Sequence, residues 1–189
     1  MNKIPKILSI AGSDSGGGAG IQADIKAISY HKGYAMTVLT AVTAQNTLGV
    51  QEIFPLPKEI IKKQLESVLD DLTPDVIKTG MLADHETIEL ISEFIENKKI
   101  VVDPVMVATS GDRLIESSAV EAIMNFLIPN AYLVTPNIYE AEILSNIKII
   151  DLETQIDAGK KILEHGAENV LIKGGHGKSE IIHDCLIQK

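Results

Sequence analysis

The sequence predicts an α/β fold in which helices lie on both faces of a mostly parallel sheet. Short apolar runs alternate along the chain with amphipathic stretches, and most of the runs are continuous and rich in β-branched residues. Such runs are typical of strands that are buried on both faces, as in parallel sheets. Parallel strands that alternate with helices are joined by right-handed crossovers, which place the helices on the sheet faces. We therefore expect three layers.

Five apolar runs are expected to form the central strands. They are residues 7–10, 76–77, 100–102, 132–134 and 170–172. Residues 36–43 alternate less cleanly between apolar and polar side chains, and we expect an edge strand or an antiparallel piece there. A last strand-like run covers residues 181–187, and nothing after it in this sequence would cover that side of the sheet.

Apolar side chains spaced three and four residues apart predict the helices, because residues at these spacings share one helix face. The groups are Ile61, Leu65, Val68 and Leu72; Ile88, Ile91 and Ile95; and Val120, Ile123, Met124 and Leu127. Residues 152–165 form a further expected helix that ends at Gly166, a common C-cap residue. No repeat, linker or low-complexity segment divides the sequence, so residues 1–189 are expected to form a single domain.

The composition favours a cytoplasmic folded protein without a nucleic-acid or membrane partner. Apolar residues make up 45% of the chain, and 17 basic against 26 acidic residues give a formal charge of −9. Nucleic acids bind to basic faces. No run approaches the ~20 apolar residues of a membrane span, and residues 7–10 are too short for a signal-peptide core. Cys185 is the single cysteine, so it forms no internal disulfide; we expect it to be a small core residue.

The segment after the first expected strand has the composition of a ligand loop. Residues 12–20 contain five glycines and lead into a helix that is expected from about Ile21. Glycines let the backbone approach a ligand, and a helix N-terminus offers free N–H groups. The loop lacks the Lys-Ser/Thr of a Walker loop, and Ile21 replaces the third glycine of a dinucleotide fingerprint. A flexible turn is the alternative, which the glycine content disfavours.

Charged and amide side chains follow other expected strands, at the edge where ligands bind in open α/β sheets. Asp103 can hold magnesium or orient a hydroxyl group, and its alternative role is a turn residue. Asn137 and Glu140 share one side of an expected first helical turn, where a capping box is the simpler interpretation.

Lys173 follows a buried strand and precedes Gly174 and Gly175, a combination that suits a phosphate group. A lysine whose stem lies along a turn is the alternative. Gln45 follows an apolar run, and its amide can recognise the edge of a heterocycle. Without further context it would be a loop residue, and His176 is expected to be a turn residue. Together, a glycine loop, two carboxylates and a lysine indicate phosphoryl transfer.

Six motifs resemble those of the hydroxymethylpyrimidine/phosphomethylpyrimidine kinases of thiamin biosynthesis, and they occur in the order of that family. They are AGSDSGGGAGIQAD (11–24), TAQNT (43–47), KTGML (78–82), DPVM (103–106), TPNIYE (135–140) and KGGH (173–176). The combination is specific and extends along the whole sequence. The family belongs to the ribokinase superfamily, with pyridoxal kinases as relatives. The resemblance therefore implies a ribokinase-like three-layer α/β/α fold with a mostly parallel central sheet.

The resemblance also implies an activity and a substrate pocket. The family uses ATP to phosphorylate 4-amino-5-hydroxymethyl-2-methylpyrimidine, and then phosphorylates the product again to the pyrophosphate. Gln45 would hydrogen-bond the aminopyrimidine ring, and Gly12 and Asp24 would lie at the pocket. Met81 and Val107 would pack on the ring.

The phosphate side of the site is implied in the same way, with ATP and Mg²⁺ as cofactors. Asp103 and Glu140 would serve the magnesium–phosphate site, directly or through water, and Asn137 would help there. Lys173 would neutralise charge on the phosphoryl group in transfer. Gly175 would belong to the nucleotide site.

Family members continue well beyond position 189, and that further segment carries a Gly-Thr-Gly-Cys-like loop with the general base, the anion hole and much of the adenine pocket. We therefore expect residues 1–189 to be an incomplete domain with weak pyrimidine binding and little turnover. The alternatives are a non-catalytic pyrimidine-binding remnant and a pyridoxal kinase; Gln45 and the Gly-Met-Leu run favour the pyrimidine. The expected partners are the pyrimidine, ATP and a second copy of the chain in a homodimer.

Overall fold

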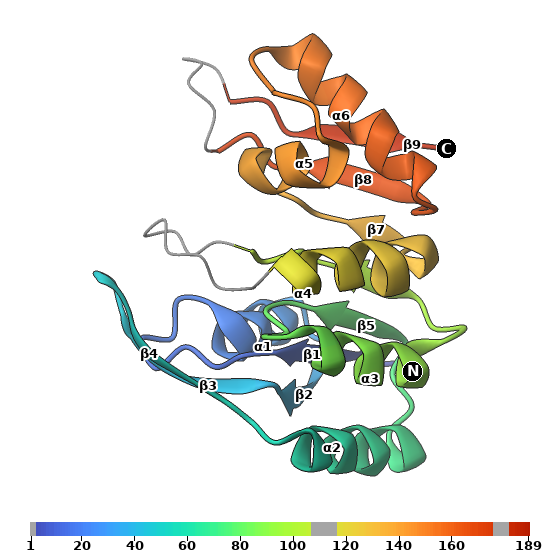
Figure 1. The fold of residues 1–189 in the computed structure, drawn as a ribbon. Helices are drawn as coiled ribbons and strands as arrows, with labels where there is room; N and C mark the ends of the chain where they lie inside the picture. The colour runs from blue at the N-terminus through green and yellow to red at the C-terminus, as the bar shows by residue number, and fades with distance from the viewer. Residues whose placement is uncertain (1–2, 107–116, 176–181) are drawn as a thin grey trace.

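A computed structural model describes residues 3–106, 117–175 and 182–189 of the chain, which form a sheet covered by helices on both faces (Figure 1). Seven strands make up the main sheet in the order β2-β1-β5-β6-β7-β8-β9. Their bounds are β2 Tyr34–Leu39, β1 Lys6–Ala11, β5 Val76–Thr79, β6 Ile100–Val102, β7 Leu133–Val134, β8 Asn169–Ile172 and β9 Cys185–Gln188. All neighbouring strands are parallel except β8 and β9, which pair antiparallel. The predicted α/β class and mostly parallel sheet are confirmed.

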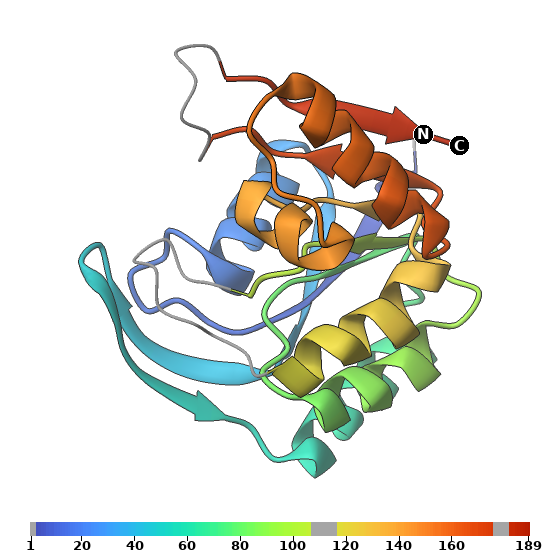
Figure 2. The same cartoon turned by 45° about the horizontal axis from the view of Figure 1, so that its top comes forward.

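The helices lie in two layers. Their bounds are α1 Gly20–Tyr30, α2 Lys58–Asp71, α3 His85–Ile95, α4 Ser117–Ala122, α5 Ile138–Ser145 and α6 Leu152–Glu164. A π-helical turn, Ile123–Leu127, and a 3₁₀ turn, Ile128–Asn130, continue α4. Helix α1 packs behind β1 and β2, whereas α3 and α4 lie in front of the sheet (Figures 1 and 2). None of these helices, within the described parts of the chain, is long and apolar enough to cross a membrane.

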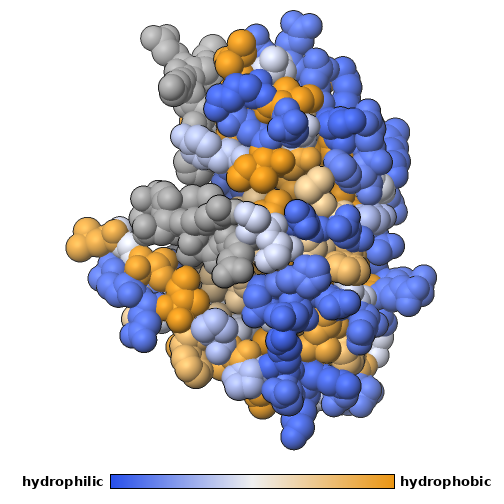
Figure 3. All heavy atoms as spheres, in the orientation of Figure 1, coloured by the Kyte–Doolittle hydropathy of each residue, from blue (hydrophilic) through white to orange (hydrophobic). Residues whose placement is uncertain are grey.

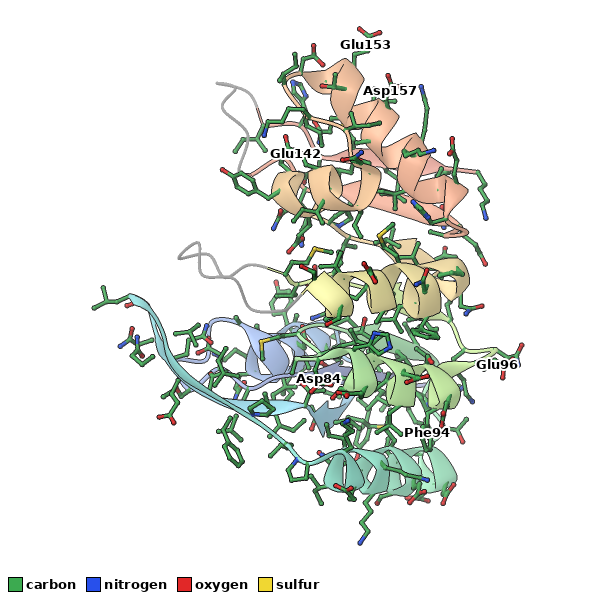
Figure 4. All side chains as sticks on the ribbon, viewed as in Figure 1. Asp84, Phe94, Glu96, Glu142, Glu153 and Asp157 are labelled. Carbon is green, nitrogen blue, oxygen red and sulfur yellow. The ribbon has the colours of Figure 1, made fainter. Side chains whose placement is uncertain are left out.

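The sequence pattern explains which side of each helix faces the sheet. Ile88, Ile91 and Ile95 of α3 are all buried, as their spacing predicts. Helix α6 begins at its N-cap Asp151 with a capping box, and Glu153 and Asp157 project from its outer face (Figure 4). The described core therefore joins the strands and helices α2 to α6 in one apolar cluster, to which α1 contributes no buried residue.

The region 36–43 contains two elements rather than one. Residues up to Leu39 belong to β2, an edge strand that is parallel to β1. The next strand, β3 (Ala41–Asn46), pairs antiparallel with β4 (Gly49–Pro55) in a separate two-stranded ribbon. The expectation of an edge strand or an antiparallel piece thus holds for the two halves in turn, whereas β4 was not predicted.

The last strand differs from the prediction of 181–187. It is Cys185–Gln188, and residue 181 lies outside the described residues. Ile187 packs on α6 so closely that a Cβ on Gly159 would lie 2.4 Å from its Cδ1. Cys185 is half-buried at this edge, so its assignment to the core was wrong. The edge strand was misjudged because it alternates in burial and shows only one apolar face to α6.

The opposite edge of the sheet is closed by a helix side chain. The Gln64 amide of α2 accepts a hydrogen bond from Leu39 N at 2.9 Å and donates one to Leu39 O at 3.1 Å. Both backbone groups of Leu39, the last residue of β2, are therefore hydrogen-bonded to the Gln64 side chain.

Candidate functional site

A cavity of about 270 Å³ opens beyond the carboxyl ends of β1, β5 and β6. Four of the five predicted pyrimidine residues line it, namely Gly12, Asp24, Gln45 and Met81. The fifth, Val107, lies outside the described residues. Asp103 also reaches the cavity, whose remaining walls come from the β3–β4 ribbon and the start of α1. The structure thus gathers into one place side chains that are distant in the sequence.

The glycine loop, residues 12–20, is organised around Asp14. This carboxylate is 5% exposed and accepts hydrogen bonds from the backbone N–H groups of Gly16, Gly18 and Ala19 at 2.7 to 2.8 Å. Burial alone would raise its pKa, but the backbone donors outweigh burial and hold the pKa below the usual value for aspartate. The loop amides are therefore bonded within the loop, and they form a shaped wall of the cavity.

Two glycines of this loop lie in close contacts. Gly20 has a φ of +55°, and a Cβ there would lie 2.4 Å from the carbonyl oxygen of Gly12. At Gly12 itself a Cβ would lie 2.6 Å from Cε of Met81. The methionine side chain can therefore rest directly on the backbone at Gly12, which leaves a flat apolar surface at the pocket.

Gln45 is positioned through its backbone by the glycine loop. Ser15 Oγ donates to Gln45 O at 2.7 Å and accepts from Gln45 N at 2.8 Å. The Gln45 side chain lines the cavity, and its Oε1 accepts a weak hydrogen bond from Thr43 Oγ1 at 3.3 Å. An amide in this place offers both a donor and an acceptor to a planar ring.

A chain of ion pairs connects the cavity with the neighbouring strand ends. Lys78 Nζ lies 3.0 Å from Asp24 Oδ2 and 3.9 Å from Asp103 Oδ2. On the other side of Asp103, Lys173 Nζ lies 2.9 Å from Oδ1. Lys78 was missed as a functional residue in the sequence, although it ends a buried strand in the same manner as Lys173.

Glu140 is the buried carboxylate of the site, at 2% exposure. Burial, assisted by the nearby negative charge of Asp103, raises its pKa to about 7, against the lowering effects of Asn137 N–H, Lys173 and Met106 N–H. Asn137 caps α5 and forms a capping box with Glu140, at 2.8 Å and 2.9 Å. The simpler interpretation of this pair is thus correct, and the cap also holds the carboxylate close enough to Asp103 for their charges to interact.

Lys173 and Gly175 lie at the far side of this edge. Lys173 N donates to Pro136 O at 2.8 Å, and a bridge between Asn137 and Lys173 extends the pairing of the two strand ends. Gly174 N donates to Asp184 Oδ1 at 2.9 Å, whereas a Cβ at Gly175 would meet nothing within 4 Å. Within the described residues, no atom lies where a side chain at Gly175 would project; His176 lies outside the described residues.

Asp103 and Glu140 are the carboxylates that could bind magnesium at this edge. Within the described ranges, no group of three or more His, Cys, Asp or Glu residues could enclose a metal ion. Asp103 and Glu140 nevertheless repel each other in a partly buried site, which a divalent cation would relieve. Magnesium in kinases is commonly bound by one or two carboxylates together with the phosphates of the substrate. The residues present fit a magnesium ion that arrives with a nucleotide.

Comparisons with known proteins identify the family of this chain. The family model described as phosphomethylpyrimidine kinase matches residues 14–189. A hydroxymethylpyrimidine/phosphomethylpyrimidine kinase of Bacillus subtilis is 46% identical over 176 residues, which cover 92% of this chain and 65% of that protein. One of Haemophilus influenzae is 45% identical over 193 residues, which cover 99% of this chain and 72% of that protein.

Solved structures show the same fold. The phosphomethylpyrimidine kinase of Clostridium difficile superposes with a TM-score of 0.91 at 46% identity, covering 99% of this chain and 81% of that one. The pyridoxal kinase of Staphylococcus aureus in complex with pyridoxal gives a TM-score of 0.91 at 37% identity, covering 99% and 70%. The predicted ribokinase-like architecture is therefore confirmed.

Proposed function

Since the chain belongs to the phosphomethylpyrimidine kinase family, we propose that the protein transfers phosphate from ATP to 4-amino-5-hydroxymethyl-2-methylpyrimidine, and then to the monophosphate, in thiamin biosynthesis. One observation carries the proposal. A cavity of about 270 Å³ is lined by an amide, Gln45, and a carboxylate, Asp24, and its edge reaches the pair formed by Asp103 and Lys173. A ring-binding pocket therefore adjoins a phosphate-binding edge.

The pocket supplies the contacts that an aminopyrimidine requires. Gln45 offers a donor and an acceptor to the ring edge, and Asp24 offers an acceptor to an amino group. Met81 over Gly12 gives the ring an apolar surface. We propose that Val107 completes this surface. Such a pocket fixes the ring so that its hydroxymethyl group lies toward Asp103, which is the positional part of catalysis.

The phosphate edge supplies charge. Lys173 would neutralise the negative charge that develops on the transferring phosphoryl group, and Gly175 would leave room for the phosphates of ATP. Asp103 and Glu140 would hold Mg²⁺, directly or through water, with Asn137 fixing Glu140 through the capping box. When bound, Mg²⁺ neutralises phosphate oxygens and draws the nucleotide into register. Asp103 also holds the Lys173 ammonium in place through a 2.9 Å contact.

The comparisons favour the pyrimidine over the alternatives. The hydroxymethylpyrimidine/phosphomethylpyrimidine kinases of Bacillus subtilis and Haemophilus influenzae are 46% and 45% identical to this chain. The pyridoxal kinases are 37 to 38% identical. A non-catalytic remnant is not favoured either, because ion pairs connect Asp24 of the pyrimidine pocket, through Lys78, with Asp103 and Lys173 of the phosphate edge.

The test combines binding and turnover in the full-length protein. We expect ATP consumption that depends on hydroxymethylpyrimidine, and its loss in Lys173→Ala by about 10² to 10³-fold with little change in pyrimidine affinity. Gln45→Ala should instead weaken pyrimidine binding by about 1–3 kcal/mol, the cost of an unpaired polar edge. Equal losses of binding and rate in Lys173→Ala would make that lysine structural, and unchanged affinity in Gln45→Ala would remove Gln45 from the pocket.

We also propose that residues 1–189 belong to one domain and that the protein is a cytoplasmic homodimer. The exposed face of the β3–β4 ribbon supports the dimer, because Val42, Leu48 and Phe54 are 44%, 88% and 62% exposed there and form apolar surface at the left of Figure 3. Sedimentation of the wild type and of Phe54→Lys tests the dimer: a monomeric variant is expected. Fractionation of cells tests the location.

A further inference from the structure

Lys78 is the cation of the cavity to which neither the sequence motifs nor the proposed mechanism assigns a role. Among the cavity-lining residues that the structure describes, it is the single lysine. Its side chain is 23% exposed, and those of its two carboxylate neighbours are 19% and 23% exposed. Charges that are so shielded from water interact more strongly than a surface ion pair does.

The register of the sheet explains why Lys78 reaches Asp24. Ser9 of β1 pairs with Lys78 of β5, so the two side chains project from the same face of the sheet. This face is covered by α1, which carries Asp24. Ser9 Oγ donates to Asp24 Oδ2 at 2.5 Å, and Lys78 Nζ donates to the same oxygen at 3.0 Å. Two neighbouring strands therefore hold one oxygen of a helix carboxylate.

The backbone beyond Lys78 leaves space for this arrangement. At Gly80, two residues further along the same face, a Cβ would lie 3.1 Å from Lys78 Nζ. The ammonium group thus lies against the backbone of its own strand end, at the floor of the cavity. A side chain at position 80 would press on it.

We infer that Lys78, together with Ser9, is a positioning residue that fixes Asp24 for the recognition of a ring amino group, and thereby makes the pocket selective for amino-substituted rings. Both described partners of Asp24 bind Oδ2, and Asp24 lines the cavity, so Oδ1 is available to a ligand there. An ionised carboxylate accepts hydrogen bonds and donates none, so it favours a ring that presents an N–H. The 3.9 Å contact of Lys78 with Asp103 joins this subsite to the phosphate edge. The inference rests on the proposed function and deepens it.

The experiment compares two rings that differ by one amino group. Calorimetry measures binding of 4-amino-5-hydroxymethyl-2-methylpyrimidine and of 5-hydroxymethyl-2-methylpyrimidine to the wild type and to Lys78→Met, Lys78→Arg and Ser9→Ala. We expect Lys78→Met to weaken the amino ring about tenfold and the deaminated ring little, as is usual for losing a charge-assisted hydrogen bond. Lys78→Arg should restore most of the selectivity. Lys148→Met, which breaks a surface pair with Glu142, is the matched control and should change neither affinity.

A second pair of variants separates positioning from a general loss of structure. In Asp24→Asn, the further change Lys78→Met should have little additional effect on the amino ring, because both act through one carboxylate. If Lys78→Met does not fold, Ser9→Ala decides, since it removes one of the two bonds to Oδ2 with almost no change in volume; a selective loss for the amino ring is expected.

The outcomes that overturn the inference are distinct from those that overturn the proposed function. Equal weakening of both rings, or unchanged binding of both, in Lys78→Met and Ser9→Ala would overturn the inference while the wild type still binds the amino ring. A wild type that binds neither ring would overturn the proposed function, and the inference with it.

Discussion

Two buried carboxylates at the same edge of the sheet behave in opposite ways. Asp14 and Glu140 are 5% and 2% exposed. The pKa of Asp14 is held below its usual value by backbone N–H donors that outweigh its burial, whereas burial raises the pKa of Glu140 to about 7. Asp14 has three donors at 2.7 to 2.8 Å; Glu140 has Asn137 N at 2.8 Å and Met106 N at 3.4 Å.

The difference shows that the negative charge of Asp14 is fully compensated by the protein, whereas that of Glu140 is not. In the glycine loop, residues 12–20, backbone N–H groups already bind the Asp14 carboxylate, so this half of the site suits a neutral ring. At Glu140 the nearby Asp103 adds repulsion, and the positive charge of Lys173 offsets only part of the combined effect of burial and repulsion. A group that arrives with positive charge, such as Mg²⁺ with its nucleotide, would stabilise the second half far more than the first.

The largest expected effect on stability comes from a substitution in the glycine loop. Gly20→Ala should lower the free energy of unfolding by about 4 kcal/mol, because it places a Cβ against the Gly12 carbonyl and forces alanine into a positive φ. Gly175→Ala is the matched control, since its Cβ would meet no atom of the described residues. Urea denaturation measures both. Similar losses of stability in the two variants would show that the close contact and positive φ at Gly20 do not determine the effect of the substitution.

The next effect concerns Glu140, whose protonation should make the free energy of unfolding depend on pH. The pKa of Glu140 is about 7 in the folded protein and 4.5 as its ordinary value, so the folded state binds more protons between these values. Stability should therefore fall as pH rises from about 4.5 to 7, by about 3 kcal/mol in the absence of Mg²⁺. Glu140→Gln, measured beside the wild type with EDTA present, should lose much less over this range. A parallel pH dependence in the two proteins would contradict the assignment.

A smaller effect of opposite sign is expected at Asp14. Its folded pKa lies below the ordinary value of 3.8, so its stabilising contribution is present above that value and is lost as pH falls through the folded pKa. Asp14→Asn should cost about 2 kcal/mol at neutral pH, since charge-assisted bonds to three loop amides are weakened. The cost should shrink in acid. Hydrogen exchange of Gly16, Gly18 and Ala19 would report the same loss locally.

The smallest effect links the lysine to the carboxylates. Lys173 lowers the pKa of Glu140, so Lys173→Met should move the Glu140 transition to higher pH by a fraction of a unit. The carboxyl carbon resonance of Glu140 would measure this shift. Lys161→Met, which removes only an exposed pair with Glu164, should leave the transition in place. A downward shift in Lys173→Met would mean that this lysine does not stabilise the ionised carboxylate.

Much of the fold was predictable because hydrophobic patterns report burial. The five central strands and the amphipathic helices α2, α3 and α6 have buried apolar faces, and the patterns identified them. Strand β4 has no fully buried residue, so it left no such pattern. Cys185 was misassigned for a related reason, since an edge strand covered on one face mixes buried and exposed positions.

The site was predictable where one motif carries its own chemistry, and less so where contacts depend on register. Gln45, Asp103 and Lys173 stand at or just after strand ends, in motifs that predict a ligand-binding role for them. The role of Lys78 depends on a partner 54 residues away, Asp24, which only the pairing of β1 with β5 brings within reach. Asp14 was part of a quoted motif, but the closed geometry of its loop follows from backbone directions that the residue types do not specify.

The two hydrogen bonds between Gln64 and Leu39 protect the exposed edge of the sheet against aggregation with other molecules. An open parallel edge invites a strand from another molecule, and such pairing begins the growth of aggregates. At Leu39 the edge cannot pair with another strand, because the side-chain amide of Gln64 in α2 already bonds both the N–H and the carbonyl oxygen of this residue. Gln64 thus takes the place of one residue of a neighbouring strand. A strand from another molecule that paired with β2 could form no hydrogen bonds with Leu39.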